Sequence, residues 1–474
     1  MSYYPILLNG KQVETASRKS IKSPWNGEEV GEVSFAGSLE IDKALEVGDR
    51  DAKTMRQLRS YQRADILHKA ADLLIERREM FARTIALEGG KPIREARAEA
   101  TRAESTFRLA AEAVRQFEGQ LLPLDITPAT GDRVALVRRF PVGLITGISP
   151  FNFPLNLVAH KVAPAIAVGC AINLKPASST PITALLLGDL LLEAGLPDGA
   201  CNVIPCESRL AAPLIEDPRV KLITFTGSGS VGWGIKQRAY KKRVCLELGG
   251  NAAVIVEPSA DLESALKRIV IGGYSHTGQI CISVQHVLVH QDIFESFKIY
   301  FIEMVNNLKC GDPLDETTEV ASLIDTGEAK RIESWLGEAV EAGAQLLTGG
   351  VRIENRVSPA ILTDVPATCR ISRDEAFGPV VLIQSYSQFE GALDWINAQQ
   401  YGLQTGVFTT EISKAMLAFN RLEVGAVIIN DVPTFRADNF PYGGVKESGF
   451  GREGVKYAIE EMTELRTLVL PSPY

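Results

Sequence analysis

Three short segments of the sequence place a thiol, a carboxylate and an amide side chain among prolines and glycines. The segments are Ser149-Pro-Phe-Asn-Phe-Pro154, Leu246-Glu-Leu-Gly-Gly250 and Gly278-Gln-Ile-Cys281. Glu247 ends an expected strand, two prolines hold the loop around Asn152, and Cys281 closes a stretch that contains Ser, His and Thr. Glu247 and Cys281 are 34 positions apart (281 − 247), a separation that suits a cleft between two domains.

These three residue types fit one series of steps on an aldehyde. A cysteine thiolate adds to the carbonyl carbon, and an asparagine amide with a backbone N–H can stabilise the oxyanion that forms. Once a hydride has passed to a nicotinamide, a carboxylate can act as general base for the water that attacks the thioester. Taken singly, each residue has an ordinary alternative: a cysteine is usually a core residue, a glutamate is usually solvated and an asparagine usually forms a turn.

The composition disfavours several classes of protein. A chain of 474 residues suits two or three domains, and a net charge of −8 argues against nucleic acid as the main partner. We expect neither a secretory signal nor a membrane partner, because no apolar run reaches the roughly 18 residues of a membrane helix. Seven cysteines are scattered without a Cys-x-x-Cys pair. This predicts a reducing cytoplasmic location, no metal site, and core positions for Cys170 and Cys245.

The elements that must position these residues begin with turns and helices. The expected elements are a hairpin over Ile6–Val33, helices over Tyr61–Leu87 and Ile93–Gln116, and a pair of strands within Leu121–Phe140. Asn9-Gly10 is a hairpin-turn sequence, and Gly89-Gly90 ends the first helix.

Two α/β alternations follow, and each is typical of a mainly parallel sheet. The first has expected strands at Gly143–Ile148, Ala171–Lys175, Cys201–Ile204, Leu222–Thr226 and Arg243–Leu246. The second has expected strands at Ala252–Val256, Val284–Val289, Val380–Ser385 and Ala426–Asn430. Ligands on such sheets bind at the carboxyl ends of the strands.

One turn of the first alternation could bind a dinucleotide. Gly227-Ser-Gly-Ser-Val-Gly232 follows an expected strand and fits the glycine pattern in which backbone N–H groups approach a pyrophosphate. The strand comes late in its unit, so a tight strand-to-helix turn explains the motif about equally well. Lys175, at the end of another apolar strand, could reach a ribose hydroxyl or a phosphate, or could be an ordinary solvated lysine.

Six motifs in order closely resemble those of the aldehyde dehydrogenase superfamily, and the resemblance covers essentially the whole chain. They are Pro150-Phe-Asn-Phe-Pro154, Phe225-Thr-Gly-Ser228, Leu246-Glu-Leu-Gly-Gly250, Gly278-Gln-x-Cys281, Glu375-Ala-Phe-Gly-Pro379, and Pro441-Tyr-Gly-Gly-x-Lys446 through Ser448-Gly449 and Gly451-Arg452-Glu453. One such motif is weak evidence of kinship, whereas six in order are specific. Val432-Pro-Thr-Phe-Arg436 is further similar to members grouped with lactaldehyde and phosphonoacetaldehyde dehydrogenases.

The resemblance implies a role for each residue type. Cys281 would be the nucleophile, Glu247 the general base and Asn152 the oxyanion donor. NAD or NADP would be the cofactor and a small-molecule aldehyde the substrate. The residues it assigns to the cofactor are Ile148, Pro150, Lys175, Ser178, Gly227, Ser228, Gly249, Glu375 and Phe377.

The resemblance also implies an α/β, aldehyde dehydrogenase-like fold of three parts. A Rossmann-like NAD(P)-binding domain is expected over residues 1–118 and 140–246, and an α/β catalytic domain over 247–445. Bridging and oligomerisation elements, including a small hairpin, are expected over 119–139 and 446–474. In such enzymes the hairpin and the C-terminal strand pair with neighbouring subunits, so we expect a homodimer or a homotetramer.

Ser178 departs from the pattern of many NAD-preferring members. Those members carry a glutamate three residues after the ribose lysine, where it accepts hydrogen bonds from the ribose hydroxyls and repels a 2′-phosphate. Serine does neither strongly, so we expect NADP to be tolerated and even preferred.

Three basic side chains depart from the pattern of members that act on apolar aldehydes. Arg102, His160 and Arg436 align with positions that are often apolar or aromatic there. Two guanidiniums that converge on a cleft would favour a carboxylate, phosphonate or phosphate on a short substrate. The alternative places Arg102 on a helix surface, paired with Glu99 or Glu104.

Three other functions stay open. An acylating enzyme would pass the acyl group to coenzyme A, but such members often lack the glutamate at the position of Glu247. A cysteine hydrolase would pair Cys281 with His276 or His286 and would leave the glycine-rich turn without a purpose. A silent binding protein would not need all three candidate catalytic residues.

Overall fold

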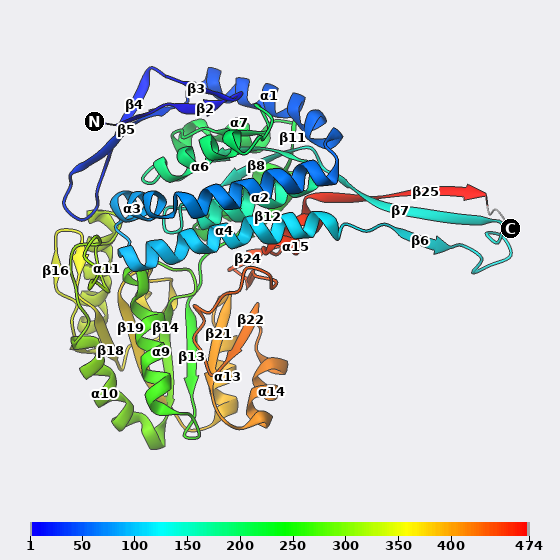
Figure 1. Cartoon of the computed structure of the whole chain (residues 1–474). Helices are drawn as coiled ribbons and strands as arrows, with labels where there is room; N and C mark the ends of the chain where they lie inside the picture. The colour runs from blue at the N-terminus through cyan, green and yellow to red at the C-terminus, as the bar shows by residue number, and fades with distance from the viewer. Residues whose placement is uncertain (1, 472–474) are drawn as a thin grey trace.

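The computed structural model describes residues 2–471 and contains two large sheets, each flanked by helices (Figure 1). The first sheet has the order β24 (Gly449–Phe450), β12 (Arg243–Glu247), β11 (Val220–Thr226), β8 (Leu144–Ile148), β9 (Ala171–Lys175), β10 (Cys201–Val203), β2 (Ile6–Leu8) and β3 (Lys11–Val13). Its five central strands are parallel, and the outer strands pair antiparallel. The five strands predicted for the first alternation are therefore confirmed.

The helices of this sheet include the most apolar part of the chain. They are α5 (Asn156–Val168), α6 (Ile182–Glu193), α7 (Ala212–Glu216) and α8 (Gly229–Ala239), with a 3-10 turn, η1, at Ser208–Leu210. Every residue of α5 is buried, because the sheet covers one side of it and further helices cover the other.

That outer layer consists of α1 (Ser38–Gln57), α2 (Ser60–Glu76), α3 (Arg78–Gly89) and α4 (Ile93–Arg115). The prediction of α4 is confirmed. The prediction of one helix over 61–87 is wrong, because the chain leaves helical geometry at Arg77 (φ −105°, ψ 14°) and starts a new helix there. Helical spacing continues across the break, so the apolar pattern alone does not reveal it.

The second sheet lies below the first in Figure 1. Its order is β15 (Gln345–Thr348), β18 (Ala360–Thr363), β19 (Val380–Tyr386), β14 (Val284–His290), β13 (Ala252–Val256), β21 (Gln404–Phe408) and β22 (Ala426–Ile429). Its helices are α9 (Leu262–Tyr274), α10 (Phe294–Asn306), α11 (Thr326–Glu341), α12 (Arg370–Arg373), α13 (Phe389–Asn397) and α14 (Ile412–Arg421). The four predicted strands are confirmed, whereas β15, β18 and β21 are additional.

A three-stranded arm projects from the two sheets (Figure 1). It is built from β6 (Gln120–Pro123), β7 (Arg133–Pro141) and β25 (Thr463–Pro471), so the predicted pair of strands is confirmed and gains a third. Two exposed leucines, Leu465 (61%) and Leu468 (55%), lie on β25. Within residues 2–471, no helix has the length and apolar character needed to cross a membrane.

The remaining elements are short. They are β1 (Tyr3–Tyr4), β4 (Ser17–Lys22), β5 (Glu29–Phe35), β16 (Arg352–Ile353), β17 (Arg356–Val357), β20 (Tyr401–Gly402), β23 (Val445–Lys446), α15 (Val455–Glu461), η2 (Ser275–Gly278) and η3 (Gln291–Ile293). The predicted N-terminal hairpin is two antiparallel pairs in different sheets, β2 with β3 and β4 with β5. Asn9 and Gly10 form the first turn with the positive φ angles (55° and 69°) that such a turn requires.

Candidate active site

The carboxyl ends of four parallel strands meet at one edge of the first sheet. Ile148 of β8 pairs with Lys175 of β9 and with Phe225 of β11, and Thr226 of β11 pairs with Glu247 of β12. The loops that follow these strands therefore start side by side. This is the edge at which parallel sheets bind ligands.

Asn152 links this edge to the loop that carries Cys281. The Asn152 side chain is 4% exposed, and its Nδ2 donates to the backbone oxygen of Gln279 over 2.8 Å. The thiol of Cys281 lies 3.0 Å from the hydroxyl of Tyr442. The structure thus brings the predicted amide within two residues of the predicted thiol.

The loop before Cys281 has an unusual backbone. His276, Thr277 and Gly278 have φ angles of 48°, 58° and 73°, the left-handed region that only glycine adopts freely. At Gly278 a Cβ atom would lie 2.0 Å from the backbone oxygen of Gly378, so no larger residue fits. Left-handed geometry at a threonine costs about 1–3 kcal/mol and is concentrated at functional sites.

Glu247 is a buried carboxylate without a hydrogen-bond donor. It is 3% exposed, and neither of its carboxylate oxygens has a hydrogen-bond partner within the described chain. Burial raises its pKa well above the usual value, and the charge of Glu453 adds to the shift, while Arg436 and Lys161 oppose it. Glu247 lies close enough to Cys281 for its charge to raise the pKa of the thiol.

Desolvation also has the largest effect on the pKa of the Cys281 thiol. Part of its surface is exposed, yet dense packing around the sulfur raises its pKa to about 12. The hydroxyl of Tyr442 and the charge of Arg436 act in the opposite direction. The thiol is therefore protonated near neutral pH until something in the cleft stabilises the thiolate.

The structure places the predicted cofactor residues around the same edge. Lys175 is 6% exposed, and its Nζ contacts the backbone oxygen of Pro176 at 3.4 Å. Burial lowers the pKa of Lys175. Ser178 Oγ lies 3.4 Å from the backbone oxygen of Cys206, and Pro150 lies in the loop after Ile148.

The glycine-rich turn and Glu375 form the other side. Gly227 N donates to Glu247 O over 3.0 Å, and exposed Ser228 precedes the first residue of α8. Glu375 accepts a hydrogen bond from Gly250 N over 3.0 Å, and desolvation raises its pKa to about 7. A Cβ at Gly249 would lie 2.3 Å from the Glu375 carboxylate.

These surroundings fit a dinucleotide. The open N-terminus of α8 suits a phosphate, and Glu375 and Lys175 suit hydroxyl groups. Phe377, with φ 48°, stacks edge-on against Phe151 at 5.8 Å and adds an aromatic wall.

Arg102 and His160 meet at Asp438. Arg102 Nη2 lies 2.6 Å from Asp438 Oδ1, and His160 Nε2 lies 2.9 Å from the same oxygen. The alternative pairing of Arg102 with Glu99 or Glu104 is wrong, because Glu99 binds Lys91 and Glu104 binds Arg108. The pKa of His160 is lowered, first by burial and then by the charge of Arg436.

Arg436 lies nearer to the thiol. Its Nη2 pairs with Glu453 over 2.7 Å, and its guanidinium carbon lies 3.9 Å from the centre of the Tyr442 ring. Its Nε has no hydrogen-bond partner within residues 2–471. Arg436 is therefore adjacent to the tyrosine that touches Cys281, while Arg102 is tied to Asp438.

Four further residues of the site were not predicted from sequence. Tyr442 and Glu453 lie inside motifs quoted above, so their place in the motifs was the available signal. Lys161 follows His160 near the middle of a largely apolar helix, and it donates to Thr226 Oγ1 over 2.6 Å. For Asp438 the sequence carries no comparable signal.

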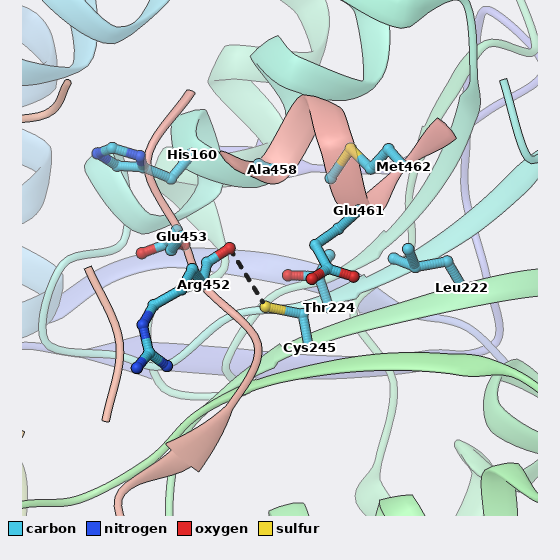
Figure 2. A pocket seen from close by; sticks show the side chains of 9 residues that line it. All are labelled: His160, Leu222, Thr224, Cys245, Arg452, Glu453, Ala458, Glu461 and Met462. Carbon is cyan, nitrogen blue, oxygen red and sulfur yellow. Dashed lines mark hydrogen bonds between the residues drawn. The ribbon is translucent and has the colours of Figure 1, made fainter. Parts of the chain in front are cut away.

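A small cavity of about 10 Å³ lies next to His160 and Glu453 (Figure 2). His160, Cys245 and Glu453 are among its lining residues, and its size allows about one water molecule. Cys245 Sγ lies 3.8 Å from the backbone oxygen of Arg452. The predicted core positions of Cys170 (0% exposed) and Cys245 (7%) are confirmed.

The histidines of the hydrolase hypothesis do not contact the thiol. Neither ring nitrogen of His276 has a hydrogen-bond partner in the described part of the chain, and His286 Nε2 lies 3.0 Å from the backbone oxygen of Ser372. Among the described residues, the thiol of Cys281 is hydrogen-bonded to Tyr442 and to no histidine.

Comparison with known proteins agrees with this geometry. Residues 12–468 match the model of the aldehyde dehydrogenase family. The chain is 42% identical to a 3-sulfolactaldehyde dehydrogenase of Priestia megaterium over 98% of both chains. It is 38% identical to a lactaldehyde dehydrogenase of Methanococcus vannielii over 95% of this chain and 96% of that one.

Two solved structures are similar over nearly their full length. Aldehyde dehydrogenase 21 from Physcomitrella patens, in complex with the reaction product succinate, has 43% identity and a TM-score of 0.98, covering 99% of this chain and 98% of that one. NADP-dependent glyceraldehyde-3-phosphate dehydrogenase from Bacillus halodurans, complexed with NADP, has 34% identity and a TM-score of 0.97, covering 99% and 100%. The α/β fold expected from the six motifs is thereby confirmed, and the chain belongs to the aldehyde dehydrogenase family.

Proposed function

We propose that the protein oxidises a short anionic aldehyde to its carboxylic acid, with NAD or NADP as the oxidant. One observation carries the proposal: the amide of Asn152 is bonded to the Cys281 loop beside a buried Glu247 that has no hydrogen-bond partner in residues 2–471. A nucleophile, an oxyanion donor and a free general base are the three groups that this oxidation needs.

The chain's own residues supply the covalent chemistry. Cys281 attacks the carbonyl carbon as thiolate, and Asn152 Nδ2 donates to the oxyanion that forms. A nicotinamide cofactor held at the edge formed by β8, β9, β11 and β12 would supply the hydride acceptor, and the acyl group would then remain on the Cys281 sulfur as a thioester. Glu247 then removes a proton from the attacking water, and cleavage of the carbon–sulfur bond frees the acid and the thiolate.

Cofactor binding is proposed at the edge formed by β8, β9, β11 and β12. Lys175 and Glu375 would face the riboses, and Ser228 at the N-terminus of α8 would face the pyrophosphate. Ser178 adds no carboxylate to the region of the adenine ribose, so we propose that NADP is accepted. The NADP complex of the related glyceraldehyde-3-phosphate dehydrogenase supports this.

An anionic substrate is proposed because of the basic groups near the thiol. Arg436 lies against Tyr442, and its Nε has no hydrogen-bond partner in the described chain. Arg102 is 30% exposed beside Asp438. The names of two relatives point the same way, since sulfolactaldehyde and succinate each carry an acid group.

Two further hypotheses concern the whole chain. We propose an NAD(P)-binding domain over 1–118 and 140–246, a catalytic domain over 247–445, and bridging segments over 119–139 and 446–474. We also propose a cytoplasmic homodimer or homotetramer, because the arm exposes leucines that a neighbouring subunit would cover.

The test compares initial rates of reduced-nicotinamide formation with NAD and NADP, using neutral and anionic aldehydes of matched length. Wild type, Arg436→Ala and the control Arg421→Ala are compared; Arg421 forms an ion pair with Asp394 on α13. We expect anionic aldehydes to be favoured, and kcat/KM for these alone to fall about 10- to 100-fold in Arg436→Ala. Neutral aldehydes that react as fast as anionic ones, in Arg436→Ala as in wild type, would contradict the anionic substrate but not aldehyde oxidation.

The same initial rates with NAD and NADP also test which cofactor the enzyme prefers. A specificity constant for NAD that greatly exceeds the one for NADP would contradict the role assigned to Ser178. Turnover of esters or thioesters in a protein that forms no reduced nicotinamide from any of the aldehydes would support the hydrolase instead.

A further inference from the structure

A buried glutamate from the outer helical layer caps the helix that follows the Asn152 loop. Glu99 of α4 is 1% exposed, and its Oε1 accepts hydrogen bonds from Leu155 N over 2.9 Å and from Asn156 N over 3.1 Å. These are among the backbone donors that the start of α5 leaves without intrahelical partners. The carboxylate also lies at the positive end of the helix dipole.

Lys91 ties the same loop from a second point. Its Nζ pairs with Glu99 Oε2 in an ion pair whose side chains are 1% and 0% exposed. The same Nζ lies 3.5 Å from the centre of the Phe153 ring, a cation–π contact. The pair therefore holds the residue directly after Asn152 and the two backbone groups that begin α5.

Fold stability alone does not account for this pair. Removing two charges from water costs several kcal/mol, and an apolar pair of similar volume often stabilises a fold as well or better. The geometric effect is specific, because the ion pair fixes the part of the loop directly after Asn152, while the bond from Asn152 Nδ2 to Gln279 O and the contact of Thr180 Oγ1 with the backbone oxygen of Phe151 hold the rest.

We propose that Glu99 and Lys91 are positioning residues for the oxyanion donor. They hold the backbone from Phe153 to Asn156, and so hold Asn152 Nδ2 toward the Cys281 loop. The inference rests on the proposed function, in which Asn152 stabilises the oxyanion.

A second buried glutamate caps a helix in the same way, from the preceding helix α3. Glu88 of α3 is 1% exposed and accepts hydrogen bonds from Ile182 N over 2.9 Å and from Thr183 N over 3.0 Å at the start of α6. The loop that it holds follows β9 and carries Ser178. Glu88→Gln therefore perturbs an equivalent helix cap on a loop that does not contain Asn152, and it serves as a control for the Glu99 variants.

The test is a mutant cycle between the pair and Asn152. The variants are Lys91→Met/Glu99→Leu, which leaves no unpaired buried charge, Asn152→Ala, and all three changes together. Each is assayed for the burst of nitrophenol from 4-nitrophenyl acetate without cofactor, in which the Cys281 thiolate displaces nitrophenolate through a tetrahedral oxyanion. Each is also assayed for the burst of reduced nicotinamide and for cofactor affinity by fluorescence titration.

We expect Asn152→Ala to slow both bursts about 100- to 1,000-fold and the pair variant to slow them about 10- to 100-fold. The triple variant should be no slower than Asn152→Ala, because residues that act through one group do not add. Cofactor affinity should stay within about twofold in the pair variant and should weaken in Glu88→Gln. Asp261→Ala, which removes the cap of α9 far from the site, should leave all rates unchanged.

Losses that multiply in the triple variant would overturn the proposal, as would a pair variant with wild-type bursts. A wild-type burst in Asn152→Ala would instead contradict the proposed function. If the pair variant does not fold, Glu99→Gln takes its place in the cycle: its one oxygen can still accept from Leu155 N and Asn156 N, while an NH2 group replaces the oxygen that accepts from Lys91, and the same outcomes apply.

Discussion

Burial raises the pKa of both side chains proposed to react in the cleft. Desolvation raises the pKa of Cys281 to about 12, and burial together with the charge of Glu453 raises that of Glu247. The thiol of Cys281 therefore holds its proton near neutral pH in the protein alone. This arrangement keeps the thiol from reacting before the cleft is filled.

The protonated thiol leads to a first prediction, on alkylation of Cys281. Iodoacetamide reacts with the thiolate, and the fraction of thiolate rises tenfold per pH unit below the pKa, so labelling should accelerate about tenfold per unit between about pH 7 and pH 9. Mass spectrometry of the Cys281 peptide separates it from exposed Cys310, which serves as an internal control. A rate that levels off below about pH 8 would show that the thiol is more acidic than its surroundings imply.

Glu247→Gln should separate the two halves of the reaction. The variant keeps the shape of the side chain and loses the base, so we expect about one equivalent of reduced nicotinamide in a fast burst and a steady-state kcat lowered about 100- to 10,000-fold. Stopped-flow absorbance measures both phases. If the burst disappears together with turnover, Glu247 acts before the thioester forms.

The residue types of the site were predictable, but their partners were not. Asn152, Glu247 and Cys281 follow from chemistry and motif spacing. Asp438 binds Arg102 across 336 positions, and such a pair arises only when the chain has folded. The sequence shows a charge but not the charge opposite, which explains why the alternative pairing of Arg102 with Glu99 or Glu104 named the wrong partners.

At the scale of elements, the segment between β22 and β23 forms part of the wall around Glu247. A Cβ at Gly443 would lie 2.9 Å from Glu247 Oε1 and 2.9 Å from the backbone oxygen of Gly451. Gly443 also has a φ of 152°. This segment leaves no room for a side chain next to the general base.

Gly443→Ala should therefore impair the enzyme without unfolding it. We expect kcat to fall about 10-fold or more and Tm to fall by several degrees, because the added Cβ meets both Glu247 and the backbone oxygen of Gly451 and sits at an unfavourable φ, all outside the hydrophobic cores. Steady-state rates and thermal unfolding measure this, and Gly391→Ala on α13, where a Cβ meets nothing within 4 Å, is the control. Wild-type kcat in Gly443→Ala would mean that Glu247 moves freely.

Apolar runs predicted most of the elements. The five central strands of the first sheet are buried on both faces, so each appears as a short apolar stretch between turns. Strand β21 escaped prediction because Gln404, Thr405 and Gly406 interrupt its apolar pattern, although all three are buried. Tertiary packing, rather than local propensity, makes that segment a strand.

At the scale of the whole molecule, the three-stranded arm exposes apolar side chains to solvent. Leu465 and Leu468 on β25 and Leu121 (66%) on β6 are exposed. The double variant Leu465→Glu/Leu468→Glu should have a lower molecular mass in solution than the wild-type oligomer. The reason is that a subunit contact through the arm would have to bury the new carboxylates. Light scattering after size exclusion measures the mass.

Leu39→Glu on α1 is the matched control, since Leu39 is 81% exposed and lies away from the arm. It should leave the mass unchanged. An unchanged mass in the arm variant as well would move the subunit interface elsewhere, and a monomeric wild type would contradict the oligomer itself.

The two capped helices have a consequence for how this enzyme can diverge. The loop that carries Ser178 is fastened to α3 through Glu88, and the loop that carries Asn152 is fastened to α4 through Glu99. If the first loop takes part in cofactor choice as proposed, mutational steps within it leave the Glu99 anchor of the second loop in place. The contact of Thr180 Oγ1 with the backbone oxygen of Phe151 joins the two loops, so a designer who grafts a new loop between β9 and α6 would keep Thr180.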